Sequence, residues 1–192
     1  MSYCVRLIRW EDIPQVTEID RESFPTLLAQ VNYQRELQNQ LAHYIVAYDD
    51  QRAVDKPDTG ETPSGRQYIV GLAGFWIMAG EAHIVNIAVQ QPYRRRGVGE
   101  LLLINLINLA IEKGAHIITL EVRASNTIAK NLYSKYDFTI RGLRRSYYSD
   151  DREDAVIMTV EGFSSSLFQE RLNLLQQAHS KKWGIAPYQV VS

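Results

Sequence analysis

The chain has 192 residues, of which 45% are apolar and 22% are charged, as in a globular protein that buries a core. Its formal net charge of -1 argues against a nucleic-acid-binding protein that relies on bulk positive charge, and its one cysteine, Cys4, excludes an internal disulfide. Charged residues interrupt the N-terminus before an apolar leader develops, and the longest apolar run, residues 69–80, is too short to cross a bilayer. We therefore expect a cytoplasmic protein without membrane contact.

The N-terminal quarter of the chain predicts one strand and two helices. Residues 3–12 predict a strand followed by Asp12, the expected N-cap of the first helix. That helix should end before Pro25, because proline disfavours the helical conformation of the residue before it. Residues 33–50 predict a second helix that runs into a strand around residues 44–48.

A polar segment comes next and separates two apolar ones. Residues 49–67 are rich in glycine and proline and have no period, so they predict a long mobile loop inserted between two strands. Residues 67–78 and 82–89 are apolar and β-branched and predict buried strands, with a turn at Gly80. Residues 98–113 predict a helix that is buried around most of its circumference, because its polar residues form one narrow stripe.

The rest of the domain continues the alternation of strands and helices. Residues 116–123 predict a strand, and residues 126–136 predict a helix with Asn126 as its N-cap. Residues 138–148 and 154–160 predict a hairpin. The alternation indicates an α/β layered domain.

The end of the chain is set apart from this domain. Residues 1–162 contain the predicted layered domain, and residues 163–192 predict a C-terminal helical extension. Ser166 and Gln169 are spaced as a capping box at the start of the extension.

The stretch QPYRRRGVGELL, residues 91–102, has the properties of an anion site. Gly97 and Gly99 lie between a predicted buried strand and the N-terminus of a long helix, where glycine allows close approach of a ligand to the backbone. Free N–H groups in a first helical turn bind anions, and the three arginines add positive charge. The stretch has neither the G-K-[ST] of a Walker A loop nor a G-x-G-x-x-G fingerprint. Taken alone, it would also fit a solvated basic turn.

Longer segments around this stretch resemble a known family. NIAVQQPYRRRGVGELLL resembles the acetyl-CoA motif R/Q-x-x-G-x-G/A of the Gcn5-related N-acetyltransferases (GNAT). LEVRASNTIAKNLYSKYDF and RRSYYSDDREDAVIM resemble the RimI group of that superfamily, which acetylates protein N-terminal α-amines, characteristically on a small-subunit ribosomal protein. The resemblance covers residues 5–160. It implies the GNAT fold, a mixed central sheet of about seven strands flanked by helices.

The resemblance also implies a donor site for acetyl-CoA, without a metal. The backbone of the central strand would bind the pantetheine arm, the glycine loop would hold the pyrophosphate, and the capping asparagine would contact CoA as well. The implied donor-site residues are Ile87, Ala88, Val89, Arg94, Arg95, Arg96, Gly97, Val98, Gly99, Glu100 and Asn126.

Two residues are candidates for the proton transfers that acetylation of an amine requires. On a strand, Glu121 shares a face with Thr119 and Arg123, so it would be either a surface carboxylate paired with Arg123 or a general base. Tyr133 would be either a packing aromatic or a general acid. The resemblance assigns the base to Glu121 and the acid to Tyr133. A phenol is a weaker acid than a thiol, so we expect the site to lower the pKa of Tyr133 or to stabilise the thiolate otherwise.

The resemblance implies an acceptor groove between the SFPTLL loop, residues 23–28, and the terminal hairpin. The resemblance implies Phe24, Tyr147 and Tyr148 as acceptor-binding residues, although the tyrosines would also suit strand packing. The acidic turn of the hairpin could attract a basic tail or simply be solvated. Members of the family often have tryptophan in place of Thr26 and glycine in place of Asp137.

The remaining polar residues do not suggest other chemistry. The four histidines show no metal-ligand spacing, and His83 and His116 are expected to be structural. The predicted function is therefore transfer of acetyl from acetyl-CoA to a protein N-terminal α-amine, by direct attack and without direct contact to nucleic acid. Acetylation of a lysine or small amine, a non-catalytic acyl-CoA-binding module and a nucleotide-binding module are the alternatives. A monomer and a homodimer both fit the sequence.

Overall fold

A computed structural model of the chain describes residues 3–24, 31–53 and 67–184. Its centre is a seven-stranded sheet in the order β1-β2-β3-β4-β5-β7-β6, in which the β4–β5 pair is parallel and the other pairs are antiparallel. The strands are β1 (Tyr3–Leu7), β2 (Ala42–Ala53), β3 (Gln67–Met78), β4 (Glu81–Val89), β5 (Ile117–Arg123), β6 (Thr139–Arg144) and β7 (Ala155–Glu161). This confirms the predicted layered fold with a mixed sheet.

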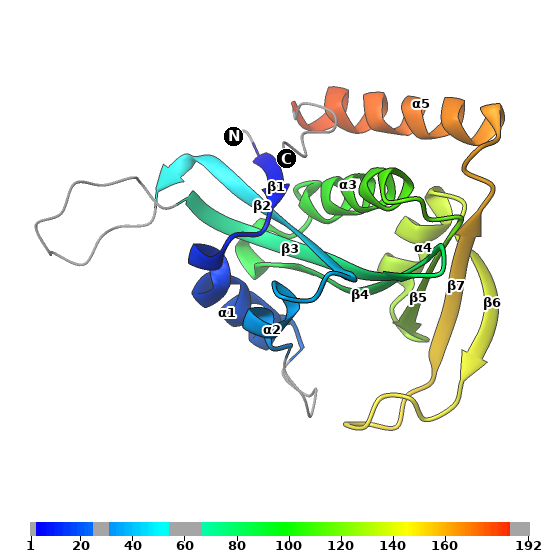
Figure 1. Cartoon of the computed structure of the whole chain (residues 1–192), viewed down its shortest axis with the longest axis horizontal. Helices are drawn as coiled ribbons and strands as arrows, with labels where there is room; N and C mark the ends of the chain where they lie inside the picture. Colours follow the sequence, from blue (N-terminus) through cyan, green and yellow to red (C-terminus); the bar gives the residue numbers. More distant parts are fainter. Residues whose placement is uncertain (1–2, 25–30, 54–66, 185–192) are drawn as a thin grey trace, which may run out of the picture.

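Helices cover both faces of the sheet (Figure 1). On one face lie α1 and α2, on the other lies α3, and α5 forms a further layer over α3. The helices are α1 (Ile13–Ser23), α2 (Tyr33–Glu36), α3 (Val98–Glu112), α4 (Thr127–Lys135) and α5 (Ser166–Trp183), with 3-10 turns at Trp10–Asp12 and Gln91–Tyr93. Across the described ranges, none of these helices combines the length and the apolarity that crossing a membrane requires.

Two apolar clusters form the core, one on each face of the sheet. The larger contains the buried side chains of α3 together with residues of β5 and β7, and α4 packs against it. The smaller joins α1 to β2 and β3 through residues such as Val16, Ile19 and Leu72. All three of these side chains are at most 1% exposed, so α1 is fixed firmly to the sheet.

The predicted polar loop is shorter than expected. The prediction of a loop over residues 49–67 is wrong at both ends, because β2 continues to Ala53 and pairs there with Gln67 of β3. Residues 54–66 lie outside the described residues. The predicted second helix is likewise reduced to the single turn of α2, and the strand begins at Ala42. Pairing of β2 with both β1 and β3 satisfies its backbone and overrides the local helical propensity.

Asp12 is the N-cap residue of α1, as predicted, but its side chain makes no cap bond to the helix. It accepts a hydrogen bond from the Arg9 backbone N–H at 2.8 Å and pairs with Arg6 at 2.6 Å. The prediction for α5 is corrected, because Ser165, not Ser166, caps that helix. The prediction of Asn126 as the N-cap of α4 is confirmed. Its side chain accepts a hydrogen bond from a backbone N–H at 3.1 Å.

Candidate active site

The site is built where the only parallel pair of strands in the described sheet separates. β4 and β5 pair at three positions, from Glu81 opposite Ile117 to His83 opposite Thr119. Beyond His83 the facing edges of the two strands carry no ladder partners among the described residues, while β4 remains paired to β3 on its other side. The separation leaves a wedge lined by the backbone of residues 84–89, the part of β4 that contains Ile87, Ala88 and Val89. Backbone groups on such an edge can hydrogen-bond an extended ligand that carries amides.

A bulge in β4 decides which side chains face which layer. The pairing with β3 shifts between Gly74 and Phe75, so β4 gains one extra residue there. As a result Ile84 packs into the cluster on the α3 face, whereas Ala88 packs into the cluster on the α1 face. Just past the bulge, Asn86 donates hydrogen bonds to Asp20 and Tyr33, at 2.8 and 2.9 Å, and so anchors α1 and α2 to this point of the sheet.

The Glu121 carboxylate lies in an ion-pair network beside the wedge. Its Oε2 is 2.7 Å from Nε2 of His83, and its Oε1 accepts a hydrogen bond from Nε of Arg144 at 3.0 Å. The hydrogen bond to His83 is the main cause that holds the pKa of Glu121 below its ordinary value, against the opposing effect of burial. The same bond raises the pKa of His83. The Glu121 side chain is 8% exposed and that of His83 is 43% exposed, so the imidazole is the accessible member of the pair.

Arg123, the alternative partner of Glu121, is engaged elsewhere. Its guanidinium pairs with Asp150 at 2.6 Å, with Asp151 at 2.9 Å and with Glu153 at 3.1 Å. These contacts fasten the turn between β6 and β7 to the end of β5. Three of the acidic side chains that were predicted to attract a basic tail are therefore already paired with Arg123.

Two tyrosines of the hairpin, Tyr147 and Tyr148, lie near the Glu121 carboxylate, and Tyr133 of α4 lies near Tyr148. Tyr133 on α4 packs its ring on Phe138, with centroids 5.8 Å apart. Burial raises the pKa of Tyr133 to about 12, with the nearby Tyr148 adding to the effect. Of the two expected alternatives, a lowered pKa of Tyr133 is therefore wrong, because apolar surroundings disfavour the phenolate, and stabilisation of the thiolate in another way stays a prediction. The charge of Glu121 reaches both Tyr147 and Tyr148, adding to the rise that burial causes in their pKa values.

The start of α3 has the features of the predicted anion site. Gly97 is its N-cap residue, with φ of +80°, and has no side chain with which to cap the helix. By contrast, α4 and α5 begin with side-chain caps from Asn126 and Ser165. Val98 is buried, but Gly99 and Glu100 are partly exposed, so the N–H groups of these two residues in the first turn of α3 can face an anion, which the helix dipole also favours.

The other residues predicted to bind acetyl-CoA in this loop make contacts with β4, with Tyr93 or with α4. Nε of Arg94 donates to the Val89 carbonyl at 3.0 Å, which ties the glycine loop to the end of β4. Arg95 adopts φ of +60°, and the Arg96 guanidinium lies 5.5 Å from the centroid of the Tyr93 ring. Glu100 accepts hydrogen bonds from Lys135 and Tyr136, which join α3 to the end of α4.

Comparisons with known proteins agree with this geometry. The model of the Acetyltransferase (GNAT) family matches residues 9–138. A protein of Bacillus subtilis strain 168, provisionally named as a ribosomal protein bS18-alanine N-acetyltransferase, is 37% identical over 157 residues, covering 81% of this chain and 93% of the relative. The chain belongs to the GNAT family of acetyltransferases.

Further relatives support the same placement within the GNAT family. The ribosomal protein bS18-alanine N-acetyltransferase of Escherichia coli K12 is 43% identical over 86 residues, which span 44% of this chain and 58% of that protein. The crystal structure of the S18-alanine N-acetyltransferase from Escherichia coli superposes with a TM-score of 0.66 at 27% identity, over 83% of this chain and 93% of that one. A GNAT acetyltransferase of Elizabethkingia anophelis, determined with acetyl-CoA bound, has the same fold, with a TM-score of 0.62 at 18% identity, over 83% of this chain and 98% of that one.

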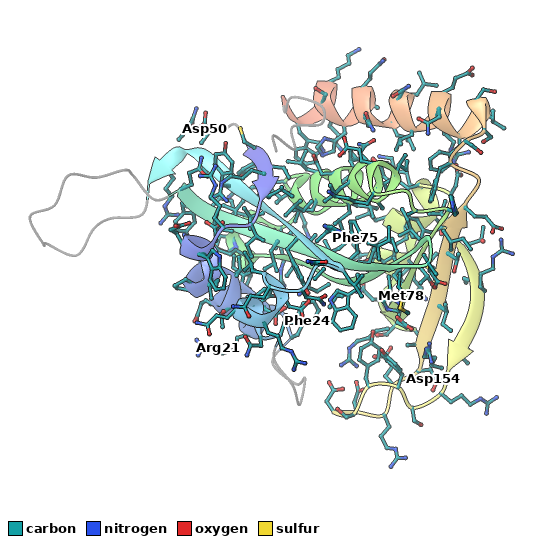
Figure 2. The ribbon with its side chains drawn as sticks, in the orientation of Figure 1. Arg21, Phe24, Asp50, Phe75, Met78 and Asp154 are labelled. Atoms are coloured by element: carbon teal, nitrogen blue, oxygen red, sulfur yellow. The ribbon has the colours of Figure 1, made fainter. Side chains whose placement is uncertain are left out.

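The predicted acceptor groove lies only partly within the described residues, which include Phe24 and the hairpin but not residues 25–30. Phe24 ends α1 and packs against the smaller core cluster. Figure 2 shows Phe24 and, in the turn between β6 and β7, Asp154, both below the central strands in that view. Thr26 lies outside the described residues. Asp137 adopts the left-handed conformation, with φ of +64°, which is the conformation that the family's glycine would adopt without strain.

His83 was expected to be structural, and its contact with Glu121 was not predicted. It is hydrogen-bonded to Glu121 from the neighbouring strand. A periodic pattern places His83 on a strand and Glu121 on another, 38 positions later, without showing that the two strands pair. Within the described ranges, no three His, Cys, Asp or Glu residues are grouped as metal ligands.

Proposed function

We propose that the chain transfers an acetyl group from acetyl-CoA to the N-terminal α-amine of a protein, with a ribosomal protein that begins with alanine as the acceptor. The names of the relatives from Bacillus subtilis and Escherichia coli support this acceptor. The observation that carries the proposal is the ionised Glu121 carboxylate paired with the accessible His83, beside the wedge between β4 and β5.

The donor side fits acetyl-CoA, which supplies the acetyl group as an activated thioester. The edge of β4 over Ile87, Ala88 and Val89 would pair with the amides of the pantetheine arm. The open first turn of α3 would hold the pyrophosphate, with Arg95 and Arg96 adding positive charge. Asn126 keeps its capping bond to α4, and its amide N–H groups would contact the donor as well.

On the acceptor side, we propose that Glu121 and His83 act together as the base. Glu121 is shielded, so His83 is the group that meets the acceptor ammonium or a water bound to it. The carboxylate orients the imidazole and stabilises the imidazolium after it takes the proton. Arg144 helps to keep Glu121 ionised.

Tyr133 is the proposed acid. With a pKa of about 12 it keeps its proton throughout the physiological range. Transfer of that proton to a thiolate of pKa near 8.5 is uphill by about 5 kcal/mol in the protein without its substrates. A hydrogen bond from the phenol to the departing sulfur is therefore the contribution we expect first, and full transfer requires that exclusion of water from the occupied site raise the basicity of the sulfur as well.

The ionisation of the acceptor favours an α-amine over a lysine. An α-amine has a pKa near 7.7–8.0, so roughly a third of it is neutral at pH 7.5, compared with about one lysine in a thousand. An α-amine thus needs less help from the His83–Glu121 pair than a lysine does.

Initial rates on paired peptides test the acceptor class. One peptide begins with a free alanine and contains no lysine; the other has a blocked N-terminus and one lysine. We expect the first to react at least about 100-fold faster, in line with the neutral fractions of the two amines. Faster reaction of the lysine peptide would make the chain a lysine acetyltransferase. Binding of acetyl-CoA without turnover of any peptide would indicate a non-catalytic module.

A further inference from the structure

The C-terminal helix α5 lies over α3 and runs in the opposite direction (Figure 1). It lies beyond residues 9–138, the segment that the family model matches. Near its start, the Gln169 side chain donates to the Phe163 carbonyl at 2.6 Å, and about two turns before its end Gln176 donates to Asn108 at 3.3 Å. Phe168 and Leu172 are buried in the large core cluster, so α5 is fixed to the domain rather than loosely attached.

The end of α5 meets the glycine loop at Gly97. The Gly97 carbonyl lies 2.9 Å from Nε2 of His179 and also accepts the first hydrogen bond of α3, from the Leu101 N–H. Since a carbonyl only accepts hydrogen bonds, Nε2 of His179 carries the hydrogen. His179 is 3% exposed, and burial lowers its pKa, which keeps the ring neutral.

The Trp183 indole packs on the same residue. A Cβ atom added to Gly97 would lie 2.7 Å from three atoms of the indole, so the ring is in contact with the bare backbone there. The positive φ of Gly97 is a separate reason for glycine at this position. Two residues of α5, one turn apart, therefore contact the single peptide unit at which α3 begins.

That peptide unit supports the donor site. The Gly97 carbonyl and the Val98 N–H belong to one rigid plane, and the same carbonyl closes the first turn of α3 through the Leu101 N–H, so a bond that fixes the carbonyl also fixes the turn. Val98 itself is buried, and the N–H groups of the partly exposed Gly99 and Glu100 in this turn are the donors proposed for the pyrophosphate. Without α5, the loop at Gly97, which is free to adopt several backbone conformations, would have to be ordered by the donor at a cost in affinity.

We propose that His179 and Trp183 are positioning residues for the pyrophosphate of acetyl-CoA, and that α5 is thereby a working part of the donor site. The inference rests on the proposed use of acetyl-CoA. His179 fixes the peptide plane through its hydrogen bond, and Trp183 limits the positions open to Gly97. Neither residue is required to touch the acetyl group.

The test compares two donors in the full-length chain. S-acetylpantetheine carries the same thioester as acetyl-CoA but lacks the pyrophosphate. For His179→Ala we expect KM for acetyl-CoA to rise about five- to tenfold, the effect of one lost orienting hydrogen bond, with kcat little changed. The kcat/KM for S-acetylpantetheine should stay within about twofold of wild type. His179→Gln keeps an N–H donor and should recover most of the affinity, and Trp183→Ala should behave like His179→Ala.

Gln176→Ala is the matched control, because it removes a hydrogen bond between the same two helices away from the loop. The kinetic constants of Gln176→Ala with both acetyl-CoA and S-acetylpantetheine should match those of the wild type. Thermal melting of all variants shows whether they are folded. The proposal is overturned if His179→Ala loses kcat/KM equally with acetyl-CoA and S-acetylpantetheine. It is also overturned if Gln176→Ala loses as much kcat/KM for acetyl-CoA as His179→Ala does. If the wild-type chain acetylates no peptide, the proposed function fails. Calorimetric affinities for CoA and pantetheine then decide the positioning role separately.

Discussion

The pairing of His83 with Glu121 makes a specific prediction about the pH dependence of the reaction. Glu121→Gln preserves the shape of the side chain and removes its charge. The hydrogen bond to Glu121 is the largest cause of the raised pKa of His83, while burial and Arg144 act in the opposite direction. In the variant, burial and Arg144 still lower the pKa of His83, and only the charge of Glu81 still raises it, so this pKa should fall.

The sign of the effect follows from which form of His83 is active. A base must be unprotonated, so wild-type activity rises with pH as His83 loses its proton, with a midpoint above the ordinary histidine value because its pKa is raised. In Glu121→Gln this limb of the pH profile should move to lower pH. In His83→Gln the limb should reflect only the titration of the acceptor amine, near 7.7–8.0.

The size of the rate loss follows from the same arrangement. General base catalysis contributes about 10²–10⁴-fold, which corresponds to about 2.7–5.5 kcal/mol in the barrier. Since roughly a third of an α-amine is neutral at pH 7.5, we expect the lower end, about 100-fold in kcat, for Glu121→Gln. If the two residues act as a unit, the double variant with His83→Gln should lose little more than the worse single variant.

Release of the CoA thiol, followed as initial rates between pH 6 and pH 9 with an alanine-initiated peptide, measures these effects. Arg141→Ala is a suitable control, because its ion pair with Glu161 is exposed and remote from Glu121. A kcat of Glu121→Gln within threefold of the wild-type value would refute the pairing of the two residues as the base. So would a pH profile whose rising limb lies at the same pH as in the wild type. Additive losses in the double variant would mean that His83 and Glu121 act independently.

Three further substitutions test other parts of the structure. Tyr133→Phe should lower kcat about 10- to 100-fold with little change in KM for acetyl-CoA, because a phenol of raised pKa is a weak acid; an unchanged kcat removes it from the mechanism. Asp137→Ala should be less stable than Asp137→Gly by about 0.5–1 kcal/mol in urea unfolding. Both variants lose the ion pair with Arg171, but only alanine is strained at positive φ. Equal free energies of unfolding would contradict this. Gly74→Ala should cost about 1–3 kcal/mol, because its Cβ would lie 2.2 Å from the buried Tyr44 ring, and a wild-type unfolding midpoint would show that the ring moves freely.

Much of the fold could be predicted from local pattern. The apolar runs of β3 and β4, the buried helix α3 and the capped helix α4 are each determined by residues close together in the chain, as is the positive φ at Gly97. The resemblance of the glycine loop and of the segment around Glu121 to GNAT enzymes named the family correctly. The extent of β2 was not predictable in this way, because polar residues 49–53 become a strand only by pairing with β3.

For the site, the sequence by itself determined which side chains are available, and the tertiary structure decided which of them meet. Glu121 could be chosen as a base from its place in the motif, but its partner His83 comes from a different strand, and β4 and β5 pair over only three positions. His179 and Trp183 likewise reach Gly97 because α5 returns along α3, more than 80 residues later in the chain. A periodic pattern reports the faces of one element, whereas pKa values and loop positions depend on contacts between elements, which form only when the layers pack.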